Sequence, residues 1–156
     1  MKTKLCLLIL LIVGLSVQLS ANPINGLLER IDKGASKKFV IEFKKGADDF
    51  FELDQKGTKV VVRGNNYVNI ATGINWYLKY YAGIQLSWNG MQAKLPQVLP
   101  PVSRKERHET SLSLRYDFNY CTYSYTMAFW DWERWEKEID WMALHGINLP
   151  LAAVGQ

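Results

Sequence analysis

The side chains best suited to contact a ligand lie in the C-terminal half of the chain, in and after the sequence SLSLRYDFNYC at residues 111–121. Asn119 and Cys121 are two residues apart, so a β-strand would project both from the same face. The loop that follows adds further polar and aromatic groups, Thr122, Tyr123, Ser124 and Tyr125. These groups could line a binding site, or they could be satisfied polar groups of a core. Cys121 is likewise either an inert buried thiol or part of the site.

Few other residues could carry out catalysis. Glu133, Glu136, Glu138 and Asp140 fall on one predicted helix, where we expect solvated charges. Asp117 is expected to pair with Arg115 deeper along the strand. The two histidines, His108 and His145, do not form a zinc set or a serine triad, and Cys121 has no evident basic partner. No phosphate-binding or calcium-binding loop is present in the sequence, so we expect neither a cofactor nor a metal.

The elements that would position Asn119 and Cys121 form a strand, a helix and a second strand. Residues 111–121 alternate strictly, with apolar side chains on one face and polar ones on the other. A helix is predicted over 132–145, capped by Asp131 and ended by Gly146, and a second strand over 147–154. This order predicts a βαβ unit with parallel strands. Pro150 conflicts with a central position for the second strand, because proline lacks a backbone donor.

A single βαβ unit leaves both strand edges uncovered, so we expect the chain to continue after Gln156. The unit fits the first strand, helix and second strand of a (β/α)8 TIM barrel. Asn119 and Cys121 would then lie toward the carboxyl end of the first strand, where barrel enzymes have their active sites. Arg115 and Asp117 would pair inside the barrel.

The residues before this unit predict a small N-terminal α/β domain over 22–97. Strands are expected at 39–43 and 50–55, paired with each other, and at 58–63. A helix should follow from its cap at Asn66 to about Tyr81 and end at Gly83. Residues 98–109 are proline-rich and then charged, which indicates a linker. The fold class is therefore α/β, with an incomplete barrel over 110–156.

Residues 1–21 are typical of a secretory signal peptide, with Lys2 and Lys4 ahead of an apolar run of about 13 residues, which is too short to span a membrane. We expect cleavage after Ala21, export to the periplasm or the extracellular space, and no stable membrane anchor afterwards. Cys6 leaves with this segment, so Cys121 remains alone and cannot form an internal disulfide.

Composition narrows the class of partner. The 156 residues are 48% hydrophobic and 22% charged, which excludes a disordered chain. The formal net charge is only +4 and no basic stripe alternates with aromatic residues, so nucleic acid is not expected as a partner. Six Trp and eight Tyr suit either a carbohydrate ligand or an aromatic core. A group of lysines reads as a solvated face that could alternatively meet an anionic glycan: Lys33, Lys37, Lys38, Lys44 and Lys45.

The sequence RYDFNYCTYSYTMAFWDWERWEKEIDWMALHGINLPLAAVGQ, residues 115–156, closely resembles the start of the catalytic barrel of α-N-acetylglucosaminidases, glycoside hydrolase family 89. The motif NxCTxSY, the run WDWxRWExEIDWMALxGIN and the final GQ carry the resemblance, and the weaker region before them resembles the small domain that precedes this barrel. The resemblance implies that Asn119, Cys121 and Tyr125 are substrate-binding residues.

The same resemblance implies an exo-acting hydrolase that removes terminal α-linked N-acetylglucosamine from glycans with retention, using two carboxylates about 5 Å apart. In that family both catalytic glutamates lie on later barrel strands, so none is expected in this chain and the chain alone should be inactive. The alternative is a secreted, non-catalytic carbohydrate-binding module that uses the aromatic-rich loop at 120–132. The oligomeric state is not indicated.

Overall fold

The computed structural model describes residues 22–151. The predicted signal peptide and the last five residues lie outside this range. Elements up to residue 110 form one group: α2 (Pro23–Ile31), the 3-10 turn η1 (Ala35–Lys38), β1 (Phe39–Phe43), β2 (Asp49–Lys56), β3 (Lys59–Gly64), α3 (Tyr67–Tyr80) and β4 (Glu106–Thr110). The second group is β5 (Tyr116–Asp117), the 3-10 turn η2 (Thr122–Ser124), α4 (Trp132–Leu144) and β6 (Leu149–Pro150). This order agrees with the predicted α/β organisation.

The four strands of the first group form one sheet in the order β1-β3-β2-β4. The strands predicted at 39–43 and 50–55 are present, but their predicted pairing with each other is wrong. β1 instead runs parallel to β3, with Phe39 opposite Val60, while β2 pairs antiparallel with β3, with Leu53 opposite Val62. The short turn after β2 connects it to β3 in a hairpin. β3 therefore lies between β2 and β1.

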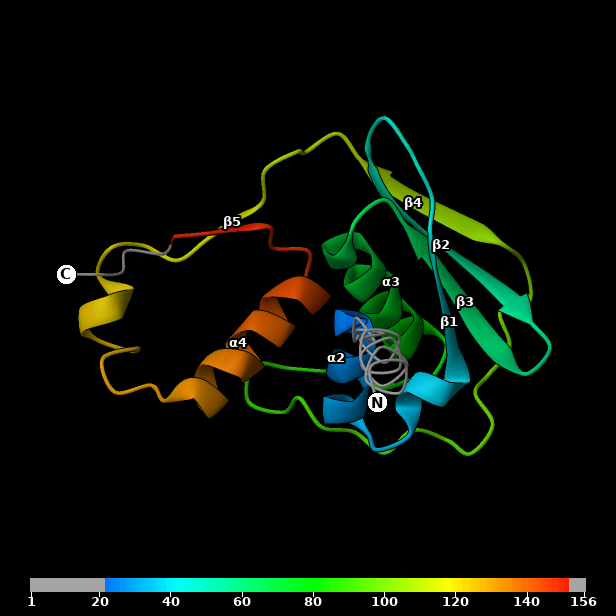
Figure 1. The fold of residues 1–156 in the computed structure, drawn as a ribbon, viewed down its shortest axis with the longest axis horizontal. Helices are drawn as coiled ribbons and strands as arrows, with labels where there is room; N and C mark the ends of the chain where they lie inside the picture. Colours follow the sequence, from blue (N-terminus) through cyan, green and yellow to red (C-terminus); the bar gives the residue numbers. More distant parts are fainter. Residues whose placement is uncertain (1–21, 152–156) are drawn as a thin grey trace, which may run out of the picture.

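Helices α2 and α3 cover one face of this sheet (Figure 1). Helix α2 was not predicted, although its apolar residues have helical spacing at Ile24, Leu27, Leu28 and Ile31, all buried. Its start also carries a cap, because the Asn22 side chain accepts a hydrogen bond from the Ile24 amide at 3.0 Å. The proline that follows suits the first turn, where no backbone donor is needed.

Helix α3 begins as predicted, with the Asn66 side chain accepting from the Asn69 amide at 2.9 Å. Gly73 allows this helix to lie close to the sheet. A Cβ at that position would stand 2.9 Å from a Val62 methyl and 3.1 Å from the Phe51 side chain. Because the helix backbone approaches the strands so closely here, a larger residue would push α3 away from the sheet.

Part of the predicted linker at 98–109 is structural. Residues 106–110 form β4, which pairs antiparallel with β2, so that Phe51 lies opposite His108. Ahead of it, Leu99 and Val102 are buried, and the Tyr77 hydroxyl donates to the Pro100 carbonyl at 2.6 Å. The charges that suggested a linker belong to an edge strand, a position where charged side chains are common.

The predicted βαβ unit is present, since β5 and β6 are parallel and α4 connects them. Asp131 caps α4 by accepting from the Arg134 amide at 2.9 Å, and Gly146 follows with a φ of 81°. The first strand is much shorter than the predicted 111–121. Leu112 and Leu114 are exposed and lie outside it, because alternation indicates a strand only where a partner supplies the hydrogen bonds.

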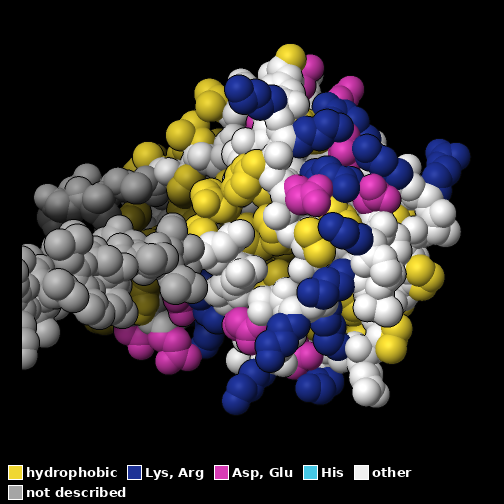
Figure 2. Space-filling view, turned by 45° about the vertical axis from the view of Figure 1, so that its right-hand side comes forward, with side chains coloured by type: hydrophobic (Ala, Val, Ile, Leu, Met, Phe, Trp, Pro, Cys, Tyr) yellow, Lys and Arg dark blue, Asp and Glu magenta, His cyan; other side chains and the backbone are white. Residues whose placement is uncertain are grey.

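The sheet face opposite the helices is strongly charged. Figure 2 shows Lys and Arg side chains gathered on this side of the molecule with Asp and Glu among them. Glu52 points to this face yet is only 2% exposed, because Lys44, Lys105 and Arg107 surround its carboxylate at 2.6 to 3.2 Å. None of the helices described is long and apolar enough to cross a membrane.

Candidate functional site

The predicted site residues lie in the loop at 118–131, which connects β5 to α4. The Asn119 side chain organises its first turn, because Oδ1 accepts from the Cys121 amide at 2.9 Å and from the Thr122 hydroxyl at 3.2 Å. Since the amide oxygen is occupied in this way, the Asn119 side-chain NH2 remains to donate to a ligand. The prediction that Asn119 and Cys121 share a strand face is therefore wrong, because β5 ends at Asp117 and both residues lie in one turn after it.

Tyr125 is one turn further along the same loop. Its backbone amide donates to the Thr122 carbonyl at 3.3 Å, and its side chain is 78% exposed. Cys121 is exposed as a free thiol, so it is not the inert buried thiol considered above. The loop thus presents an amide, a thiol and a phenol ring to solvent, groups that suit a polar, ring-shaped ligand.

The backbone changes direction immediately before Asn119. Phe118 has a φ of 70°, and it is the only residue other than glycine with a positive φ within 22–151. A left-handed conformation is costly for a bulky side chain. Asp117 supports it, because its carboxylate accepts from the Phe118 amide at 2.8 Å. The strand alternation ends here, so residues 119 and 121 do not continue the face that carries 115 and 117.

The predicted pairing of Arg115 with Asp117 is wrong. Arg115 reaches the N-terminal sheet instead, where its guanidinium lies 2.8 Å from the Asp49 carboxylate. Burial alone raises the pKa of Asp49, but hydrogen bonds from Arg115, Asn69 and Asn65 and the charge of Arg115 hold it below its ordinary value. Arg115 also donates to the Leu112 carbonyl at 2.6 Å. Arg115 therefore fixes the base of β5 to the first domain.

A cavity of about 330 Å³ lies behind the loop, between it and α4. Its wall combines Trp88 from the N-terminal domain with residues of both flanking elements: Asp117, Phe118, Thr122, Thr126, Met127, Trp130, Glu138 and Trp141. No role could be assigned to Trp88 from the sequence, and Trp130 was named only as part of the aromatic-rich loop at 120–132 of the alternative binding module. The high number of tryptophans in the sequence was the only available indication of such a site, because no local pattern connects two residues 42 positions apart.

The prediction that all the acids of α4 are solvated is wrong. Glu133 is exposed, but Glu138 and Asp140 are only 2% and 8% exposed. Glu138 bonds to Trp88 and Arg134, and Asp140 to Arg30. These carboxylates face the N-terminal domain, which covers this side of the helix. They are held in ion pairs and are not free to act as acid or base at the loop.

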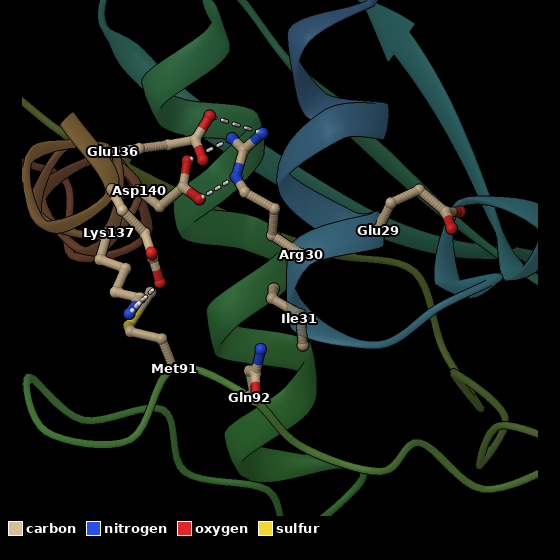
Figure 3. A pocket seen from close by; sticks show the side chains of 9 residues that line it. Glu29, Arg30, Ile31, Met91, Gln92, Glu136, Lys137 and Asp140 are labelled. Atoms are coloured by element: carbon tan, nitrogen blue, oxygen red, sulfur yellow. Dashed lines mark hydrogen bonds and ion pairs between the residues drawn. The ribbon is translucent and has the colours of Figure 1, made fainter.

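A second cavity, about 270 Å³, lies in the seam between α2 and α4 (Figure 3). Arg30 dominates it, donating from Nε and Nη2 to the two Asp140 oxygens at 2.6 and 2.7 Å and approaching Glu136 at 3.4 Å. Lys137 pairs with Glu133 at 3.0 Å. Since these charges already satisfy one another, this cavity is a contact between domains and does not compete with the loop as a ligand site.

The geometry thus supports binding more than bond cleavage. Asn119, Cys121 and Tyr125 supply hydrogen bonds and an aromatic ring. Within residues 22–151, no group of three or more His, Cys, Asp and Glu side chains could hold a metal ion.

Comparison with known proteins gives two family matches. Residues 22–101 match the alpha-N-acetylglucosaminidase (NAGLU) N-terminal domain, and residues 115–156 match the NAGLU TIM-barrel domain. The second match contains the whole loop with Asn119, Cys121 and Tyr125. The small α/β domain and the βαβ unit are therefore the N-terminal domain and the start of a TIM barrel.

Individual relatives agree. Human alpha-N-acetylglucosaminidase is 42% identical over 125 residues, which are 80% of this chain and 17% of the human protein. CpGH89 from Clostridium perfringens, in a variant with two Glu-to-Gln substitutions bound to its substrate GlcNAc-alpha-1,4-galactose, superposes with a TM-score of 0.79 at 39% identity. The family 89 glycoside hydrolase from the same organism in complex with PUGNAc gives the same values.

These superpositions include 83% of this chain but only 15% of each solved chain. It therefore corresponds to about one sixth of the relatives it matches. Because the N-terminal family match alone spans more than half of the chain, and the barrel match adds most of the rest, the chain belongs to the alpha-N-acetylglucosaminidase family, glycoside hydrolase family 89.

Proposed function

We propose that this chain is the N-terminal part of an exported, exo-acting retaining glycoside hydrolase that removes terminal α-linked N-acetylglucosamine from glycans. The observation that carries the proposal is the coincidence of two independent results at one loop. The loop at 118–131 presents Asn119, Cys121 and Tyr125, and the same residues lie in the match to the NAGLU barrel. The CpGH89 relative in complex with a terminal GlcNAc disaccharide supports the substrate class.

In this proposal the loop binds the sugar and residues outside the 156 supply the catalytic carboxylates. The described acids near the loop support this division, because Asp117 holds the Phe118 amide and Glu138 is held by Trp88 and Arg134. In an α-linked N-acetylglucosamine the 2-acetamido group is on the same ring face as the leaving oxygen, so it cannot displace that oxygen from behind. The enzyme must therefore provide its own nucleophile, consistent with a retaining mechanism through two carboxylates.

The test begins with the open reading frame beyond the codon for Gln156, expressed together with this chain. The longer protein should hydrolyse an aryl α-N-acetylglucosaminide but not its β-anomer, and proton NMR should detect the α-anomer of the sugar as the first product. The 156-residue chain alone should show no turnover. Hydrolysis of the β-anomer, or β-sugar as the first product, would overturn the proposal.

Replacing Asn119 by Ala in the longer protein should weaken substrate binding, because the side-chain NH2 is lost as a donor and the turn loses its two internal hydrogen bonds. N-terminal sequencing of the secreted protein should begin at Asn22 if the export proposal holds.

A second candidate is a secreted carbohydrate-binding module without catalysis, favoured by the exposed aromatic rings of Tyr120, Tyr125 and Phe129 on the loop. Calorimetric titration of the 156-residue chain with free N-acetylglucosamine separates the two. Measurable affinity of the isolated, folded chain, together with a reading frame that stops at Gln156, would favour the module.

A further inference from the structure

Trp88, in the loop at 85–91, contacts a buried charge. Its indole Nε1 donates to the Glu138 carboxylate on α4 at 2.7 Å. Glu138 is only 2% exposed, whereas Trp88 is 45% exposed and belongs to the N-terminal domain. A buried carboxylate requires its hydrogen-bond partners to offset the cost of desolvation, so this bond has strict geometric requirements. It joins the N-terminal domain to the barrel segment.

Arg134 completes a compact cluster around this bond. Its guanidinium donates to the same Glu138 oxygen at 2.7 Å and lies 4.8 Å from the Trp88 ring centre and 3.8 Å from the Trp130 ring centre. A cation between two indole rings is attracted to both faces. We refer to Trp88, Trp130, Arg134 and Glu138 as the tryptophan clamp.

Trp130 connects the clamp to the sugar-binding residues proposed above. Its backbone amide donates to the Met127 carbonyl at 3.1 Å, and the Met127 amide donates to the Thr122 carbonyl at 3.1 Å. The Thr122 hydroxyl in turn donates to the Asn119 side-chain oxygen at 3.2 Å. Met127 is only 4% exposed, so this path runs through a packed part of the loop. An uninterrupted set of contacts therefore leads from Trp88 to Asn119.

We propose that the tryptophan clamp is a positioning device, through which the N-terminal domain sets the position of Asn119 and Cys121 for the sugar. This inference rests on the proposed function. The clamp residues do not touch substrate in this account. They hold Trp130 in a fixed position next to α4, and Trp130 in turn holds the loop at 118–131. The N-terminal domain thereby contributes to substrate affinity although it supplies no binding residue.

The first test uses the longer, active protein and the substitution Trp88→Phe, which keeps an aromatic ring over Arg134 but removes the donor to Glu138. Because a displaced binding loop weakens substrate contacts, KM should rise by about tenfold while kcat changes by less than about twofold. The matched control is Trp76→Phe, because Trp76 belongs to the same domain and its ring packs, tilted, against Phe51 and His108. KM of the control should equal that of the wild type.

A second variant, Glu138→Gln, keeps the shape of the acceptor and removes its charge, so it should raise KM in the same direction as Trp88→Phe. In the double variant the two effects should be far from additive, since both break one cluster. If Trp88→Phe and Glu138→Gln lower the melting temperature and leave KM at the wild-type value, the clamp is merely structural and the inference is overturned.

A readout that does not depend on activity separates failure of this inference from failure of the proposed function. Cys121 is exposed, and with Cys6 replaced by Ser it is the only thiol of the 156-residue chain. Its rate of reaction with an aromatic disulfide reagent reports the turn formed by Asn119. Trp88→Phe should change this rate by about threefold or more, and Trp76→Phe should not. Equal rates would overturn the positioning role whatever the enzyme assay gives, whereas a changed rate without α-glucosaminidase activity would refute only the proposed function.

Discussion

The Glu52 carboxyl is buried and its pKa is strongly lowered. Burial alone raises the pKa of this carboxyl, but hydrogen bonds from Lys44 and Arg107 and the ion pair with Lys105 outweigh burial and lower the pKa to about 2. A carboxyl whose pKa is depressed on folding stabilises the protein above its unfolded-state pKa, and this stabilisation is lost as the pH falls through the folded-state value.

We therefore expect Glu52→Gln to lower the free energy of unfolding by about 2 kcal/mol near pH 7, and the difference from wild type to fade between about pH 4.5 and 2. Urea unfolding at several pH values measures this. Glu109→Gln is the control, because Glu109 pairs only with Arg107 at the exposed edge and should cost less than about 0.5 kcal/mol. A difference in the free energy of unfolding between Glu52→Gln and wild type that stays constant with pH would contradict the lowered pKa of Glu52.

The positive φ of Phe118 redirects the chain just before Asn119 and can be tested by substitution. Comparison of Phe118→Gly with Phe118→Ala isolates the backbone, since both remove the ring. At a left-handed position glycine should be the more stable of the two by about 1 kcal/mol, whereas at an ordinary extended position alanine would be. Urea midpoints of the two variants give the sign, and a more stable alanine variant would show that φ is negative in solution.

Among the elements, α4 shows most clearly what the sequence could and could not predict. Its limits followed from local signals, the cap at Asp131 and the glycine at position 146, and both are confirmed. Its buried face did not follow, because Glu138 and Asp140 are buried against partners about 50 and 110 residues earlier in the chain. A charge count along one helix contains no information about such distant partners.

In the sheet, too, local features were predictable from the sequence and long-range contacts were not. The strands at 39–43, 50–55 and 58–63 were recognisable from apolar and β-branched residues, whereas the order β1-β3-β2-β4 depends on which edge each strand joins. Asn119, Cys121 and Tyr125 stay predicted binding residues: their position in and after the first strand drew attention to them, and the family resemblance gave them their role. Trp88 and the turn at Phe118 were missed, because tertiary contact and backbone strain leave no periodic pattern.

Arg30 joins α2 to α4 through both oxygens of Asp140. The hydrogen bond to Asp140 also raises the pKa of Arg30 above its usual value. Arg30→Lys keeps the charge but cannot reproduce the two-point geometry, and should lower the free energy of unfolding by about 1 to 2 kcal/mol. Lys137→Gln, which removes an exposed pair with Glu133 on the same helix, should cost less than about 0.5 kcal/mol. If thermal unfolding shows the same loss of stability for Arg30→Lys and Lys137→Gln, the two-point bond between Arg30 and Asp140 does not stabilise the contact between α2 and α4.

For the molecule as a whole, the buried apolar residues are unevenly distributed. Nearly all members of the main hydrophobic cluster come from residues 24–102, and α4 contributes Leu144. The barrel segment exposes large apolar side chains instead: Leu112, Leu114, Tyr116, Tyr120, Phe129 and Leu149. Polar bonds connect the two parts, from Arg115 to Asp49, from Arg30 to Asp140 and from Trp88 to Glu138. Helix α4 also packs against α3 and buries Leu144 in the main cluster. We therefore expect the segment with the loop to depend on the N-terminal domain for its stability.

This distribution predicts a hierarchy of local opening in the 156-residue chain. Backbone amides of β2, β3 and α3 should exchange with deuterium at least about a hundredfold more slowly than those of β5 and β6, because few buried apolar contacts oppose local opening of the short strands. Hydrogen exchange followed by mass spectrometry on peptides from each element measures the difference. Asp49→Asn, which removes the charge that pairs with Arg115, should speed exchange at β5 and leave β1 unchanged, since β1 pairs with β3 and not with the strand that carries Asp49. Uniform protection across both groups would mean that the barrel segment is stable without support from the N-terminal domain.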